Sequence, residues 1–549
     1  FFAMGGGRRW RALAAGLLVE AAAGTAYAFG VYSPQLKTKL GWSQTQLEAV
    51  GTYGNIGLYC GFLGGVFFDR YGTKPTLAIG VVLSFLGYAM MWAGDGDHFG
   101  APGTVAFMGL GAAIWSHGSA WYDCATIATV AKNFPADRGR IIGLLKSLFG
   151  LSAAIAAQFY LSFFKPDAEP FLLFLAIYIA GLGVVGTLFV SEVPGEEATP
   201  LGKPGMRRAQ FATTVIGVLA VFLATVAVLQ SRWILDGAET ASQLAASKVF
   251  SYVLIALVLL NMLVAVRRCP LWGRSDKEEP EEAYLLDYRS SSDGGPSSTI
   301  HVSFGQSLTD PNFYLIFLAV MCGTGAGLMV INNLGQMVES LGGGKGSQDV
   351  FVTLLSVFNC GGRVLAGFLS DKYSRTVIRP LWLALAVLGM GASQVLLVFS
   401  PLDLFYVAIP LVGLFYGSFW SLLPTIIADI WGTKAFGKIY SLASLAPGFG
   451  SILMAQQLAG RIYDSHYNVP GTKECTGHVC FQLTHILLAI FCAVGVAAAL
   501  LVSARLRKHY AMLREGSRFS TGVRATSSVQ VSAERRRASS AHRLEAAAD

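Results

Sequence analysis

Charged residues are scarce in this chain of 549 residues. Asp, Glu, Lys and Arg make up 13% of the sequence, whereas soluble domains carry about 25%. Three catalytic motifs are also absent: the phosphate-binding loop Gly-x-x-x-x-Gly-Lys-[Ser/Thr], the metalloprotease pair His-Glu-x-x-His and the hydrolase turn Gly-x-Ser-x-Gly. The composition excludes an ordinary soluble protein. The missing motifs give no reason to expect an enzyme, an ATP-driven pump or a resident cofactor.

The net charge of +8 is distributed among loops rather than gathered into one basic segment, so we expect no nucleic-acid partner. Most of the eight cysteines lie in apolar stretches, where they serve as small hydrophobic residues. Only Cys475 and Cys480 are close together in a polar loop, and we expect them to form a disulfide on an oxidising side of the membrane. A metal site there would need more ligands than His478 supplies, so we predict none.

Apolar runs long enough to cross a bilayer of about 30 Å recur along the whole chain. We predict fourteen spans in groups of six, two and six, and therefore an all-α integral membrane protein. The spans lie near 11–32, 46–67, 75–94, 104–130, 140–164, 171–191, 211–229, 247–266, 313–335, 349–369, 378–399, 403–428, 437–460 and 483–504.

The grouping of the spans predicts five regions. They are a six-helix bundle (1–200), a two-helix linker (201–270), a disordered loop (271–311), a second bundle (312–505) and a disordered basic tail (506–549). Lys and Arg concentrate in alternate loops, which places both termini in the cytosol. The stretch Glu281–Leu286 resembles an acidic dileucine sorting signal, although a solvated loop explains it as well. The membrane is therefore either the plasma membrane or a vacuolar or lysosomal one.

Two related turns connect helices at corresponding places in the two halves. Gly65-Val-Phe-Phe-Asp69-Arg70-Tyr71-Gly72-Thr73-Lys74 follows the second span, and Gly367-Phe-Leu-Ser-Asp371-Lys372-Tyr373-Ser374-Arg375 follows the second span of the other half. This Gly-x-x-x-Asp-Arg-x-Gly-x-Lys pattern resembles the loop between the second and third helices of the major facilitator superfamily. The resemblance implies two six-helix bundles that carry a small-molecule substrate by alternating access.

Further motifs narrow the resemblance. They include Lys132-Asn-Phe-Pro135, Gly143-Leu-Leu-Lys146, Asn333-Leu-Gly-Gln336, Asn359-Cys-Gly-Gly-Arg363 and Gly460-Arg-Ile-Tyr-Asp464. In these the chain is similar to the nodulin-like family, and the similarity covers nearly all of the folded sequence. Few members of that family have an assigned substrate, so the resemblance does not supply one.

The residues of the two turns are expected to form gates at the cytosolic ends of the helices. A carboxylate there can pair with an arginine or with the N-terminus of a neighbouring helix. We hypothesise that Asp69 pairs with Arg138 or Arg140. The predicted gating set is Gly65, Asp69, Arg70, Gly72, Lys74, Arg138, Arg363, Gly367, Asp371 and Arg375.

Ionisable residues deep in a span are costly and therefore point to function. Glu20 lies in the middle of the first span, with Tyr27 near the same face; it is either a proton-coupling group or a neutral acid held by a neighbouring helix. Asp123 and Lys146 lie on consecutive antiparallel helices, each about 9–12 Å from their shared loop at 1.5 Å per residue. They could pair, or Lys146 could extend to the membrane surface.

The second half contributes polar residues to spans that line the central cavity in the superfamily. Asn332, Asn333 and Gln336 lie on its first helix and Trp420 on its fourth, where they could hydrogen-bond a substrate. Arg363 is placed near the cytosolic end of its span, as a gate or a phosphate-facing anchor.

The sequence therefore predicts a monomeric secondary transporter for a small polar or anionic metabolite, coupled to protons through Glu20 or Asp123. A membrane sensor that signals through its long loop and tail is the alternative. Gate-like turns in both halves favour the transporter.

Overall fold

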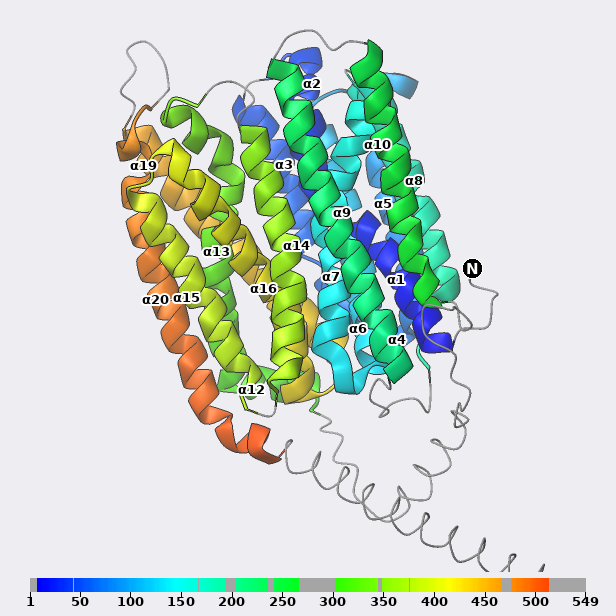
Figure 1. Ribbon diagram of the computed structural model, residues 1–549, viewed down its shortest axis with the longest axis vertical. Coiled ribbons are helices and arrows are strands. Elements are labelled where there is room, and N and C mark those ends of the chain that lie inside the picture. The colour runs from blue at the N-terminus through cyan, green and yellow to red at the C-terminus, as the bar shows by residue number, and fades with distance from the viewer. Residues whose placement is uncertain are drawn as a thin grey trace, which may run out of the picture.

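The computed structural model describes residues 7–42, 44–165, 167–193, 203–235, 241–265, 302–343, 348–374, 376–466 and 475–512. These residues form helices and connecting turns, with no strand among them. Figure 1 shows two bundles side by side, the N-terminal one at the right and the C-terminal one at the left. The predicted all-α class with two six-span bundles is confirmed.

The N-terminal bundle contains six spans, of which the first two are interrupted. The first consists of α1 (Arg8–Ala23), the 3₁₀ turn η1 (Gly24–Ala28) and α2 (Phe29–Leu40), and the second of α3 (Gln44–Tyr59) and α4 (Phe62–Tyr71). The others are α5 (Thr73–Asp95), α6 (Val105–Asn133), α7 (Arg138–Phe159) with the π turn η4 (Tyr160–Phe164), and α8 (Ala168–Phe189). The first span thus runs eight residues beyond its predicted end at 32.

The break in the first span lies where two backbones meet. A Cβ at Gly24 would clash with the carbonyl oxygen of Phe149 on α7, so only glycine allows this approach. The 3₁₀ turn η1 follows at once and brings Tyr27 toward the middle of the molecule.

The C-terminal bundle is preceded by the short helix α12 (Phe304–Thr309). Its spans are α13 (Pro311–Ser340), α14 (Gln348–Lys372), α15 (Arg379–Val398), α16 (Phe405–Trp431), an interrupted fifth span and α20 (Gln482–Arg505). The fifth contains α17 (Phe436–Ala443), α18 (Leu445–Gly450), the π segment η8 (Ser451–Ala459) and α19 (Gly460–Ser465). A capping aspartate, Asp310, and a proline at the first position start α13.

The linker forms a helical hairpin of α9 (Lys203–Leu235) and α10 (Ala241–Leu260), the latter extended by η5 (Asn261–Ala265). Helix α9 packs against α7 of the first half and α14 of the second (Figure 1). Buried polar bonds join the hairpin to the first half: Gln158 Nε2 and Ser162 Oγ donate to the Ser247 carbonyl (3.2 and 2.8 Å), and Ser251 donates to Ser162 Oγ (2.8 Å).

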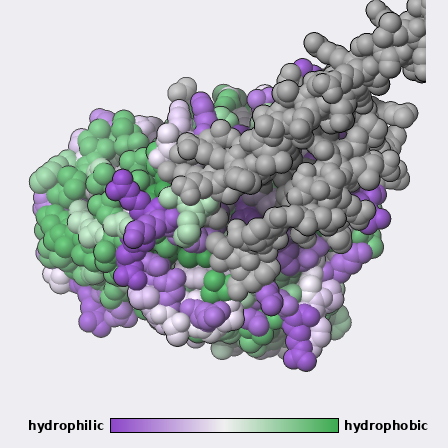
Figure 2. All heavy atoms as spheres, turned by 90° about the horizontal axis from the view of Figure 1, so that it is seen from below, coloured by the Kyte–Doolittle hydropathy of each residue, from purple (hydrophilic) through white to green (hydrophobic). Residues whose placement is uncertain are grey.

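Ten helices in the described ranges are long and apolar enough to cross a membrane. The other four of the fourteen spans are the three interrupted segments and α6, which carries His117 and Asp123. Apolar side chains are exposed along the outer faces, for example on α15 and α20: Leu381, Leu385, Leu388, Val395, Ile486, Ile490, Val494 and Leu501. Figure 2 shows this flank as a hydrophobic area at its left, as expected of a surface that faces lipid.

Replacing Gln158 by Leu should loosen the linker hairpin. The change removes the buried hydrogen bond from Gln158 of α7 to the Ser247 carbonyl of α10 and the one to Ser162 Oγ of η4, each worth about 0.6 kcal/mol in a membrane protein. We expect a lower melting temperature in detergent. Thr225→Val is the control, because the exposed Thr225 hydroxyl bonds only within its own helix, to the Val221 carbonyl. Equal melting temperatures for the two variants would contradict the predicted role of the network.

Candidate functional site: a charged cavity between the two halves

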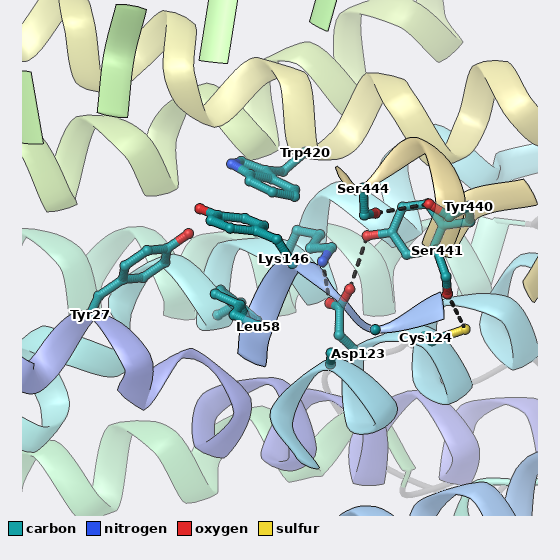
Figure 3. A pocket seen from close by; sticks show the side chains of 13 residues that line it. Tyr27, Leu58, Asp123, Cys124, Lys146, Trp420, Tyr440, Ser441 and Ser444 are labelled. Carbon is teal, nitrogen blue, oxygen red and sulfur yellow. Dashed lines mark hydrogen bonds and ion pairs between the residues drawn. The ribbon is translucent and has the colours of Figure 1, made fainter. Parts of the chain in front are cut away.

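A small cavity of about 40 Å³ lies between the two halves (Figure 3). Its wall combines polar and aromatic side chains from η1, α3, α6, α7, α16 and α17: Tyr27, Tyr59, Asp123, Cys124, Lys146, Phe149, Trp420, Tyr440, Ser441 and Ser444. Pockets for drug-sized ligands have volumes of roughly 300–1,000 Å³, so in this conformation only a small chemical group fits.

Asp123 and Lys146 form an ion pair inside this cavity, which is one of the two arrangements that their equal depth on α6 and α7 left open (Figure 3). The second carboxylate oxygen of Asp123 accepts a hydrogen bond of 2.9 Å from the hydroxyl of Tyr440 on α17. The carboxylate therefore joins the N-terminal half to the C-terminal half at the level of the cavity.

Lys146 does not extend to the membrane surface, because its side chain is only 2% exposed. Its ammonium group lies over three aromatic rings, with Nζ 4.9 Å from the ring centre of Phe149, 5.5 Å from that of Trp420 and 5.8 Å from that of Tyr440. Such cation–π contacts stabilise a cation where water is excluded.

Glu20 is fully buried on α1, as expected for its position in mid-span. Neither of its carboxyl oxygens has a hydrogen-bond partner within 3.5 Å in the described part of the chain. Its charge interacts with those of Asp123, Lys146 and Arg363, which places it in the same electrostatic group.

Arg363 lies elsewhere than predicted. It is fully buried, and its Nη1 donates to the backbone carbonyl of Lys146 (2.7 Å) while its Nε donates to Asn359 Oδ1 (3.0 Å). Its guanidinium carbon is 5.3 Å from the ring centre of Phe149 and 5.9 Å from that of Trp420. Arg363 therefore lies behind the cavity wall, not at the helix end that the sequence predicted.

Of the other predicted site residues, Tyr27 and Trp420 line the cavity, but the polar residues of α13 do not. Asn332 is exposed and contacts Ser451 Oγ (3.4 Å), and Asn333 bonds the Met329 carbonyl of its own helix. Gln336 is likewise outside the lining. Sequence reasoning missed Tyr440 and Ser444, whose only signal is a polar group inside an apolar span.

Asp69 closes the bundle at one end, hereafter called the Asp69 end. Its two carboxylate oxygens accept backbone hydrogen bonds of 3.0 Å each from Gly437 and Lys438, at the N-terminus of α17. The hypothesis that Asp69 pairs with Arg138 or Arg140 is wrong. The carboxylate instead satisfies backbone N–H groups that a helix leaves unpaired in its first turn.

Asp371 of the second half makes the equivalent contact with a helix of the first half. Its oxygens accept from the backbone N–H groups of Gly139 (3.2 Å) and Arg140 (2.6 Å), at the N-terminus of α7. Arg379 bonds both Asp371 (2.7 Å) and Asp429, and Arg138 lies 3.7 Å from Asp429. A carboxylate of each half thus caps a helix of the other.

The glycine four residues before each aspartate explains how the helices approach so closely. A Cβ at Gly65 would clash with the carbonyl oxygen of Gly437, and one at Gly367 with that of Gly139. Of the remaining predicted gating residues, Gly72 provides the positive φ of 81° that ends α4, and Arg70 and Lys74 are exposed. Arg375 lies outside the described residues.

At the opposite end, Cys475 and Cys480 form the expected disulfide. The loop is attached to α13 by a hydrogen bond from the Gly477 N–H to the Ser340 carbonyl (2.7 Å). In the described ranges there is no cluster of three or more His, Cys, Asp or Glu side chains that could hold a metal ion.

A family model described as Nodulin-like matches residues 9–281, and one described as the C-terminal domain of NFD4 matches residues 300–512. The chain belongs to the nodulin-like family. Together the two matches cover almost every described residue of both bundles.

Two curated relatives of this nodulin-like chain are similar over most of their length. Protein NUCLEAR FUSION DEFECTIVE 4 of Arabidopsis thaliana is 23% identical, over 92% of this chain and 90% of its own. Probable transporter MCH1 of Candida glabrata is 24% identical, over 82% of this chain and 84% of its own. The solved structure of the proton:xylose symporter XylE matches 91% of this chain and 95% of its own at 14% identity, with a TM-score of 0.54. The fold is that of the major facilitator superfamily, and family and fold indicate a multi-pass secondary transporter, not an enzyme.

Replacing Lys146 by Met should strongly destabilise the nodulin-like bundle, because it leaves the Asp123 carboxylate buried without its cation. Breaking one partner of a buried pair costs about 3–5 kcal/mol. The double variant Lys146→Met/Asp123→Asn should recover part of the loss. Thermal unfolding in detergent measures both.

The control is Lys132→Met, which breaks a partly exposed pair with Glu192 (2.6 Å). Such surface pairs are worth about 0–1 kcal/mol, so its melting temperature should stay close to that of the parent protein. If the destabilisation of the double variant equals the sum of those of Lys146→Met and Asp123→Asn measured singly, the pair is not the source of the effect.

Proposed function

We propose that the protein moves a small polar or anionic metabolite across a membrane by alternating access, coupled to protons. The observation that carries this proposal is the pair of reciprocal caps, Asp69 on α17 and Asp371 on α7. They join the two halves at one end only of a cavity whose charged and aromatic wall comes from both halves. A membrane sensor has no need for such matched closures.

The contacts at the Asp69 end are of a kind that can open and close. They include hydrogen bonds and close glycine contacts between helices, so separating the halves exposes backbone and carboxylate groups that water can solvate. The conformation described is the one closed at this end. Opening would break both caps and lead from the Asp69 end to the cavity.

The positions of the charged residues support both an orientation in the membrane and a coupling to protons. The excess of Lys and Arg in the loops at the Asp69 end supports a cytosolic location for that end and for both termini. Glu20 and Asp123 are the acidic groups placed to exchange a proton next to the cavity. The membrane would be the plasma membrane or a vacuolar or lysosomal one.

Asp69→Asn should shift the equilibrium toward the state open at the Asp69 end. The variant keeps one acceptor oxygen but loses the charge, and hydrogen bonds to charged groups contribute about 1.5–3 kcal/mol. The buried Cys124 is a natural reporter, because it lines the cavity directly behind the cap, 3.4 Å from Ser441 Oγ. We expect faster labelling of Cys124 by a membrane-impermeant maleimide, by about tenfold or more if 1.4 kcal/mol of closure is lost.

The assay needs a background in which Cys60, Cys269, Cys322, Cys360 and Cys492 are replaced by alanine. Asp403→Asn is the matched control, because Asp403 is an exposed aspartate at the opposite end. An unchanged labelling rate in Asp69→Asn would remove Asp69 from the closure, and unchanged rates in both Asp69→Asn and Asp371→Asn would count against alternating access from this end.

A further inference from the structure

Four ionisable groups lie together beside the cavity, three of them buried and the fourth, Asp123, partly exposed to it. Glu20 on α1 and Asp123 on α6 are acidic, and Lys146 on α7 and Arg363 on α14 are basic. The Tyr440 hydroxyl of α17 faces the same group. Asp123, Lys146, Arg363 and Tyr440 are the four titratable or charged groups that face Glu20 from the helices described around it.

Lys146 and Arg363 differ in whether a carboxylate neutralises their charge. Lys146 has an ion pair with Asp123, whereas no carboxylate of the described residues lies within 4 Å of Arg363. Arg363 bonds only neutral oxygens, and its Nη2 is buried with no hydrogen-bond partner in the same described ranges. A buried cation without an anion is costly, so its charge must be balanced from a distance.

Glu20 supplies that balance only while it is ionised. With a carboxylate at Glu20, the two acids and two bases sum to zero. With a neutral carboxylic acid there, the group carries one net positive charge in an environment that water does not screen. The protonated state therefore lacks one negative charge next to the cavity.

We propose that the protein takes up one small organic monoanion together with one proton, the proton on Glu20 and the anion in the cavity beside Lys146. This inference rests on the proposed transport function and specifies its substrate class and stoichiometry. The negative charge of the anion neutralises the positive charge that the proton adds to the group. Binding of the proton and binding of the anion therefore each raise the affinity for the other. The loaded group and the empty one, with Glu20 ionised, both have a net charge of zero.

The chemistry of the cavity wall suits a monocarboxylate of few carbon atoms. Lys146 has N–H donors for a carboxylate, and Tyr27, Phe149 and Trp420 offer apolar surface to a short carbon chain. A dianion would leave the loaded site with a net negative charge, and a sugar would leave the charge of protonated Glu20 and Arg363 unbalanced.

The test uses the purified full-length protein in liposomes with radiolabelled pyruvate as the probe, and with glucose, alanine and succinate as neutral, zwitterionic and dianionic comparisons. With the membrane potential clamped by potassium and valinomycin, a pH gradient should concentrate pyruvate about tenfold per pH unit, since one unit is about 1.36 kcal/mol per proton. A change of potential at equal pH should drive no accumulation.

Substitutions at Glu20 and Arg363 test which residue carries the proton and which balances the anion. Glu20→Gln mimics the protonated acid, so exchange of internal for external pyruvate should persist while net uptake driven by pH is lost. Glu339→Gln, at an exposed glutamate of α13, should behave like the parent protein. Arg363→Gln should weaken pyruvate exchange at least about tenfold, because it removes the positive charge that the anion balances, and Arg363→Lys should restore part of it.

The outcomes distinguish a failure of the proposed stoichiometry from a failure of the proposed transport function. Uptake of glucose, alanine or succinate in place of pyruvate, or accumulation of pyruvate that follows the membrane potential, would overturn the stoichiometry and leave transport standing. Equal loss of exchange and net uptake in Glu20→Gln would give Glu20 a structural role and also overturn it. No transport of any of the four compounds would count against the transport function itself.

Discussion

The cost of burying charge in a medium without water governs this structure. Each half contains charged side chains that could not remain inside a bilayer alone, and Lys146, Asp123 and Arg363 each contact a partner on another helix. Lys146 is held by Asp123 and by three aromatic rings, and Asp123 also by Tyr440 of the other half. The charges that make the cavity useful are therefore the ones that hold the two halves in register.

Buried carboxylates are also compensated at the Asp69 end, where backbone N–H groups take the place of side-chain cations. The first N–H groups of α7 and α17 need acceptors, and an aspartate from the opposite half supplies two oxygens to each. A glycine one turn earlier on the helix that carries the aspartate removes the side chain that would keep the backbones apart. Four residues in each half thus create a closure that repeats by pseudo-symmetry.

Features set by short sequence distances could be predicted, and those that depend on contacts between the halves could not. The Asp123–Lys146 pair follows from depth counting, because both helices meet at one short loop. The link from Asp123 to Tyr440 spans 317 positions and has no local signal. Arg363 was misplaced because counting locates its Cα, whereas its side chain points back toward the N-terminus of α14, where it reaches Asn359 and the Lys146 carbonyl. The partner of Asp69 was also missed, because a helix N-terminus attracts a carboxylate without any charged residue to indicate it.

The position of α9 gives the two seams between the halves different mechanical properties. On one seam α7 and α14 share α9 as a common neighbour, and the hairpin is fixed to the first half by the Gln158–Ser162–Ser247 bonds. On the other seam, in the part of the chain described, α4 meets α17 without a third helix fastened in this way. A rocking motion that separated α7 from α14 would have to shear α9 along one of them, whereas parting α4 from α17 would break the Asp69 cap without shearing α9. The seam beside the linker hairpin is therefore stiffened by a third helix, and the seam between α4 and α17 lacks that support in the described residues.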